Sequence, residues 1–102
     1  MTEKWADFLI SKVQYNAAET HIVKVLLHED LGDVISRGTE ETRGTVVAHL
    51  DGGRTVMTIY RGAEGKWTRG AEVRVVNIGG EKFIRTDRDA TKKDNLGNLP
   101  RF

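Results

Sequence analysis

The chain has 102 residues, a net charge of +1, a charged fraction of 30% and no cysteine. This length leaves room for one hydrophobic core, so we expect residues 1–102 to form a single domain. The absence of cysteine excludes a disulfide framework, a thiolate nucleophile and a zinc ribbon. The N-terminus has no apolar segment and no window of the sequence reaches the length of a membrane span. We therefore expect no signal peptide, no membrane partner and a cytoplasmic location.

Two extended segments begin the chain, Asp7–Tyr15 and His21–His28. Both are rich in β-branched and large apolar residues that alternate between two faces, and Asn16–Glu19 separates them. This pattern predicts an antiparallel hairpin with a short loop.

The polar stretch Glu29–Glu41 follows the hairpin. It contains turn signals at Gly32–Asp33 and Arg37–Gly38, which favour a loop. Within this loop we expect Val34 and Ile35 to add a brief extended piece.

The segment Thr42–Gly53 changes from the period of a strand to that of a helix. Its apolar side chains form one helical stripe: Val46, Val47 and Leu50. Thr39 or Thr42 can cap the N-terminus, and Gly52–Gly53 supplies a stop. The helix is short, so it must be stabilised by packing on a sheet.

Three more extended segments follow the helix, at Thr55–Arg61, Ala71–Ile78 and Glu81–Asp87. A turn at residues 62–65 precedes the second of them. Gly79–Gly80 joins the last two, and it predicts a two-residue hairpin because both glycines can adopt positive φ.

The predicted order is β-β-α-β-β-β, and the links between strands are short except for the helical crossover. Short links require antiparallel pairs. The fold class is therefore α+β, with a mostly antiparallel sheet of about five strands and one short helix packed on it. A sheet curled toward a small barrel is the alternative.

Residues 88–102 are predicted to form an irregular tail that packs back on the core. Asn95 and Gly97 can turn the chain so that Leu96 and Leu99 point inward. An exposed docking motif is the alternative for this tail.

The sequence predicts no metal site and no cofactor. His21 and His28 fall on opposite faces of one strand and His49 lies on the helix, whereas zinc needs three or four converging ligands. Asp87 begins a spacing like that of a calcium loop, but Lys92 stands where that loop requires glycine.

The two serines give little sign of catalysis. Neither Ser11 nor Ser36 lies in a G-x-S-x-G elbow, and Ser11 falls in the middle of a strand. We find no nucleophile, acid and base that would converge, and we expect the protein to be non-catalytic.

The second half of the chain is basic, and its cations are interleaved with aromatic residues. Exposed aromatic rings flanked by Arg and Lys can stack bases and hold phosphates. The candidate binding surface consists of Arg61, Lys66, Trp67, Arg69, Arg74, Lys82, Arg85 and Arg88. Phe83 lies among them but is expected in the core, while Trp67 is expected equally in the core or on the surface.

Several segments of the chain together resemble a known family. They are Asp7–Asn16, Thr20–Asp33, Thr42–Val47 and Glu81–Pro100, and the most specific piece is DNLGNLP at Asp94–Pro100. The chain resembles DUF3892, a domain-of-unknown-function family of short bacterial proteins. The resemblance implies a compact stand-alone bacterial domain and supplies no activity, cofactor or catalytic residue.

Our leading hypothesis is a small non-catalytic interaction module that binds a protein partner or itself as a homo-oligomer. Open sheet edges favour this reading, since a small domain gains by pairing or covering them. The alternative is nucleic-acid or nucleotide-phosphate binding through the basic C-terminal strands. A third hypothesis is an enzyme whose site forms between subunits.

Overall fold

The computed structural model describes residues 5–18, 20–32, 34–61, 65–86, 96 and 99–102. Its elements along the chain are β1 (Phe8–Tyr15), β2 (Ile22–Glu29), β3 (Thr39–Thr42), α1 (Arg43–Asp51), β4 (Val56–Arg61), β5 (Trp67–Glu72), β6 (Arg74–Ile78) and β7 (Glu81–Arg85). Within the described residues, no helix has the length and apolar character needed to cross a membrane.

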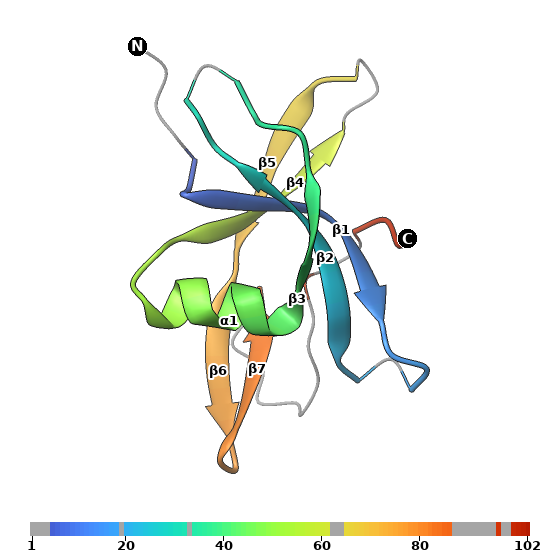
Figure 1. Ribbon diagram of the computed structural model, residues 1–102, viewed down its shortest axis with the longest axis vertical. Helices are drawn as coiled ribbons and strands as arrows, with labels where there is room; N and C mark the ends of the chain where they lie inside the picture. Colours follow the sequence, from blue (N-terminus) through green and yellow to red (C-terminus); the bar gives the residue numbers. More distant parts are fainter. Residues whose placement is uncertain (1–4, 19, 33, 62–64, 87–95, 97–98) are drawn as a thin grey trace.

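The fold is α+β, with a five-stranded mixed sheet in the order β3-β2-β1-β4-β5 (Figure 1). A two-stranded sheet, β6-β7, extends from one end of the molecule, and α1 lies beside it. The pair β1/β4 is parallel, and the other pairs are antiparallel. The predicted fold class is confirmed. The barrel alternative is wrong, because the sheet stays open with β3 and β5 at its edges.

Helix α1 forms as the sequence predicts. The Thr42 side chain caps it by accepting a hydrogen bond from the backbone N–H of Thr45, and Gly52 forms the C-cap. Val46 is fully buried, and Val47 and Leu50 pack against the same core. The helix is therefore held on the sheet by its apolar stripe.

The predicted strand Ala71–Ile78 is in fact two strands, and this is a correction. The chain breaks at Val73, whose side chain is buried and whose N–H donates to the Val56 carbonyl at 2.8 Å. Before this point β5 pairs with β4, and after it β6 pairs with β7. Strand β5 consequently begins at Trp67, earlier than the sequence suggests.

Strand β3 is a second correction, because it lies at the end of the stretch predicted to be a loop. Its residues Thr39–Thr42 pair antiparallel with the part of β2 that runs from Lys24 to Leu27. Three of its four residues are exposed, so hydrophobic patterning gives no sign of it.

The main core lies on one face of the sheet. Buried side chains of β1, β2 and β4 meet Val46 of α1 and Ile84 of β7 there. A smaller cluster on the opposite face consists of Ala6, Leu9 and Ile59, with Trp5, Ile35, Met57 and Trp67 packed against it. The two sheet faces thus carry unequal amounts of apolar packing.

A β-bulge at Ser11 changes the pattern of β1. Ile10 pairs with Leu27 and Lys12 pairs with Leu26, so Ser11 is an extra residue without its own partner. Ile10 and Val13 consequently both reach the main core. Ser11 and Lys12 instead share the opposite face, where they help to form the candidate site.

The end of the chain contacts the centre of the sheet. Leu96 and Leu99 are both buried in the main core, as the sequence predicts for these two leucines. The Val13 N–H donates to the Pro100 carbonyl at 3.0 Å, and the Phe102 N–H donates to the Val13 carbonyl at 3.2 Å. Residues 87–95 and 97–98 lie outside the described residues, and with them most of the predicted tail.

Candidate ligand-binding pocket

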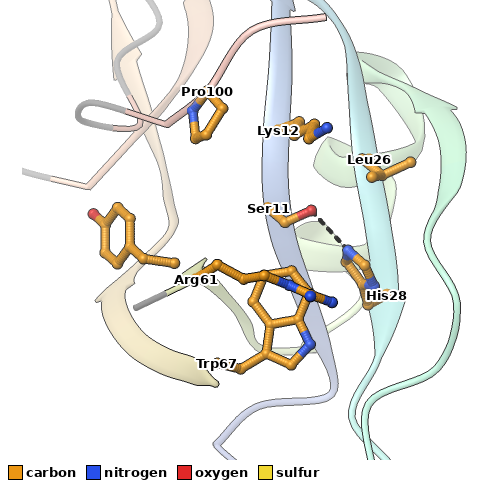
Figure 2. A pocket seen from close by; sticks show the side chains of 8 residues that line it. Ser11, Lys12, Leu26, His28, Arg61, Trp67 and Pro100 are labelled. Carbon is orange, nitrogen blue, oxygen red and sulfur yellow. Dashed lines mark hydrogen bonds between the residues drawn. The ribbon is translucent and has the colours of Figure 1, made fainter. Parts of the chain in front are cut away.

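A pocket of about 490 Å³ opens on the sheet face opposite the main core. Its wall is formed by side chains of β1, β2, β4 and β5 together with the end of the chain (Figure 2). The residues that line it are Ser11, Lys12, Leu26, His28, Tyr60, Arg61, Trp67 and Pro100.

Ser11 and His28 form a hydrogen-bonded pair in the pocket wall. Ser11 Oγ and His28 Nε2 are 2.7 Å apart, and both residues are more than nine-tenths buried. Figure 2 draws this bond between β1 and β2, which carry the two side chains.

The other ring nitrogen of His28 fixes the tautomer. His28 Nδ1 lies 2.8 Å from the backbone carbonyl oxygen of Ser36. A carbonyl can only accept, so Nδ1 carries the hydrogen and donates it. In the neutral ring Nε2 then has a free lone pair, and it accepts the hydroxyl hydrogen of Ser11.

The loop behind His28 is held against β2. The Glu29 N–H donates to Ser36 Oγ at 2.7 Å, and the Ser36 N–H donates to the Glu29 carbonyl at 3.0 Å. Gly38 passes so close to the imidazole that a methyl group there would lie 2.8 Å from His28 Cε1. The ring is therefore fixed by its surroundings as well as by its hydrogen bonds.

Arg61 and Trp67 form the cationic and aromatic part of the wall. The Arg61 guanidinium carbon lies 4.6 Å from the centre of the Trp67 ring, within the range of a cation–π contact. The indole is half-buried and packs against the smaller core cluster, and this packing fixes its position. It also meets the His28 ring edge-on, with centroids 5.4 Å apart.

The charges of the pocket wall are positive. Lys12 is exposed and Arg61 is exposed, and the described part of the wall contains no carboxylate. Leu26 and Pro100 add apolar surface to the same wall. Such a wall suits a ligand that has a planar apolar part and a negative charge.

A model of the family described as protein of unknown function (DUF3892) matches residues 9–100. The chain belongs to this family. No curated protein and no solved structure matches it. Each pocket residue that the structure describes falls within the span matched by the DUF3892 model.

The structure brings together part of the candidate surface predicted for this DUF3892 chain. Arg61 and Trp67 lie in contact in the pocket. Lys66 and Arg69 are exposed next to Trp67, and Arg69 follows it by two positions along β5, on the same face of the strand.

The remaining predicted residues lie elsewhere. Arg74, Lys82 and Arg85 belong to the β6–β7 sheet, and the described wall of the pocket contains no residue of that sheet. Lys82 Nζ instead binds Asp51 Oδ2 at 2.7 Å. Arg85 was predicted on the binding surface, but it is only 3% exposed and lies in the interior. Arg88 lies outside the described residues.

The polar centre of the pocket is not predicted from the sequence. Ser11 falls in mid-strand without a catalytic motif and His28 without converging ligands, although the two belong to the two strands of the predicted hairpin. The signal that was present is a polar serine within an otherwise apolar strand. The β-bulge that turns Ser11 toward His28 is not indicated by any residue pattern around Ser11.

Within the described residues, no group of three or more His, Asp or Glu side chains could hold a metal ion.

Proposed function

We propose that this DUF3892 protein binds a small anion with a planar ring, of the nucleotide-phosphate class, in the pocket between β1, β2, β4 and β5. The observation that carries the proposal is the Arg61 guanidinium over the Trp67 ring within a positively charged pocket. A base can stack on the plane of an arginine guanidinium as well as on an aromatic ring, and arginine binds phosphate oxygens through two parallel hydrogen bonds.

The size of the pocket supports a ligand of this kind. A volume of about 490 Å³ lies within the usual range of small-molecule sites, roughly 300–1,000 Å³. Such sites combine an apolar wall with a few fixed polar groups. Leu26, Pro100 and Trp67 supply the apolar wall, and Ser11 and His28 supply fixed polar atoms.

Calorimetry with AMP, adenosine and inorganic phosphate tests the proposal. We expect AMP to bind more tightly than either fragment, because AMP alone has both the ring and the phosphate. Arg61→Ala should weaken AMP binding about tenfold or more, since it removes a charged hydrogen-bond donor. Added salt should weaken binding by the unchanged protein as well.

Arg74→Ala is the matched control, because Arg74 is a strand arginine that does not line the pocket. We expect it to leave AMP binding unchanged. Equal losses for the two arginine variants, or no AMP binding at low salt, would contradict the proposal.

A protein partner or a second copy of the chain is the second candidate. The five-stranded sheet has two edges, β3 and β5. Glu40 and Glu41 make β3 negative, whereas at β5 Arg69, together with Lys66 just before the strand, outnumbers Glu72. Pairing of one edge with the other would be favoured by this complementarity.

We also propose a bacterial host and a cytoplasmic location. The bacterial host follows from the family resemblance, and the cytoplasm is where free nucleotides are abundant. Cell fractionation followed by detection of the protein tests the location.

A further inference from the structure

We propose that Ser11 is a nucleophile activated by His28, and that the pocket hydrolyses an ester of a ring-bearing anion. The inference rests on the proposed function for the class of substrate. It goes beyond that function because it assigns a chemical reaction to two residues of the pocket wall.

The geometry of the pair is that of a nucleophile and its general base. A hydroxyl becomes a useful nucleophile when a base within hydrogen-bond reach takes its proton as it attacks. Ser11 Oγ lies 2.7 Å from His28 Nε2, which is the nitrogen that has the free lone pair. No rearrangement of the ring is needed for the proton to move.

The third component is a group that orients the base. In serine hydrolases a carboxylate usually accepts the second imidazole hydrogen and holds the ring in the required tautomer. Here the Ser36 carbonyl occupies that position at 2.8 Å from Nδ1, and two hydrogen bonds between Ser36 and Glu29 hold it there. A carbonyl gives less stabilisation to an imidazolium than a carboxylate does, so we expect slow turnover.

The pair is also open to a ligand. A buried Ser–His pair with a purely structural role could be enclosed on all sides, whereas both of these residues line the pocket. The bulge is the reason, since it turns Ser11 away from the main core and toward the cavity. Lys12 and Arg61 line the same cavity, and their charges favour the oxyanion that forms during attack.

The reaction follows from these positions. Ser11 Oγ attacks the ester carbonyl carbon and its proton passes to His28 Nε2. The bond from the carbon to the leaving oxygen breaks, and Nε2 returns the proton to that oxygen. Water then attacks the acyl group on Ser11, giving up a proton to Nε2, and the carboxylic acid leaves as Ser11 Oγ regains its proton.

A fluorophosphonate probe with peptide mass spectrometry tests the nucleophile. The probe phosphorylates an activated serine through attack of Oγ on phosphorus with loss of fluoride. The chain has two serines and no cysteine, so the modified peptide distinguishes Ser11 from Ser36 directly. We expect the adduct on Ser11.

Two histidine variants test the base. His28→Gln keeps an amide that can hydrogen-bond but removes the proton acceptor, and we expect labelling of Ser11 to slow by about 100-fold or more. His49→Gln is the matched control, because His49 stacks on Phe8 and does not line this pocket. Circular dichroism of both variants shows whether they fold.

The outcomes separate this inference from the proposed function. No adduct on Ser11 in a protein that still binds AMP would overturn the nucleophile and leave ligand binding intact. An adduct that forms equally fast in folded His28→Gln would overturn the role of His28. Labelling of Ser11 that depends on His28 supports the inference. If AMP does not slow this labelling, the proposed binding of a nucleotide in the pocket is contradicted, while the role of Ser11 stands.

Discussion

Gly38 occupies a position where the surrounding side chains leave no space for a methyl group. A Cβ there would lie 2.6 Å from Leu26 Cγ and 2.8 Å from His28 Cε1. Both of these residues line the pocket. The absence of a side chain at Gly38 is thus part of what positions the imidazole next to Ser11.

Gly38→Ala should therefore destabilise the fold by about 1–3 kcal/mol, the usual cost of overpacking. It should also slow fluorophosphonate labelling of Ser11, because His28 must shift to relieve the contact. Urea unfolding measures the first effect, and mass spectrometry measures the second.

Gly44→Ala is the matched control for this prediction. A Cβ at Gly44 would meet Thr42 Oγ1 at 3.8 Å, an ordinary contact, and the residue lies within α1. We expect a gain in stability of about 0.4–1 kcal/mol from the reduced entropy of the unfolded chain. A stability loss at Gly44 as large as that at Gly38 would contradict the steric explanation.

Strand β1 is the element that joins the core to the pocket. It pairs with β2 along its length, but with β4 only from Phe8 to Ile10. Beyond that point the end of the chain contacts β1 at Val13. The backbone of Pro100 and Phe102 thus hydrogen-bonds to β1 beyond the point where β4 ends its pairing, and the Pro100 side chain lines the pocket.

Leu96→Ala should destabilise the protein by about 2–5 kcal/mol, because Leu96 is fully buried in the main core. Phe102→Ala is the control, since the Phe102 side chain is 39% exposed and its backbone hydrogen bond survives the substitution. We expect it to cost less than about 1 kcal/mol. Urea denaturation compares the two, and similar midpoints would refute the structural role of Leu96.

The elements that the sequence predicts correctly have local causes. The first hairpin follows from apolar strands around a short loop, α1 follows from a cap and an apolar stripe, and the last hairpin follows from Gly79–Gly80. Both glycines adopt positive φ, 60° and 85°. Each of these features is contained within a few neighbouring residues.

The elements that it misses depend on distant parts of the chain. Strand β3 forms because it pairs with β2. The chain breaks at Val73 because that residue is buried and hydrogen-bonds to Val56. The Ser11–His28 contact joins residues 17 apart through a bulge. The basic residues were predicted as one surface, but a break between β5 and β6 separates them into two sheets.

At the scale of the whole molecule, the two faces of the five-stranded sheet differ in apolar packing and in charge. Most of the buried apolar side chains among the described residues belong to the main core, on the face where Val46 of α1 and Ile84 of β7 meet the sheet. The opposite face has a smaller cluster and the cationic pocket. Substitutions in the pocket wall can therefore alter binding with little effect on the main core.

Self-association through the sheet edges is a prediction at this scale. Light scattering over a dilution of about a hundredfold should show a mean molar mass that decreases as the protein is diluted. Arg69→Glu should lower the mass further at a given concentration, because it removes the charge complementarity with Glu40 and Glu41. A monomer of constant mass throughout the dilution would contradict this second candidate function.

The most direct test of the pocket is the fluorescence of Trp67 during titration with AMP. The chain has two tryptophans, and Trp5→Phe leaves Trp67 as the single reporter. Trp5 bonds to Asp30 through its backbone N–H, so this hydrogen bond survives the substitution. We predict saturable quenching by AMP that weakens with salt and is lost on adding Arg61→Ala. Trp67 fluorescence that does not change at AMP concentrations where calorimetry detects binding would contradict the account, because the ligand would then bind elsewhere.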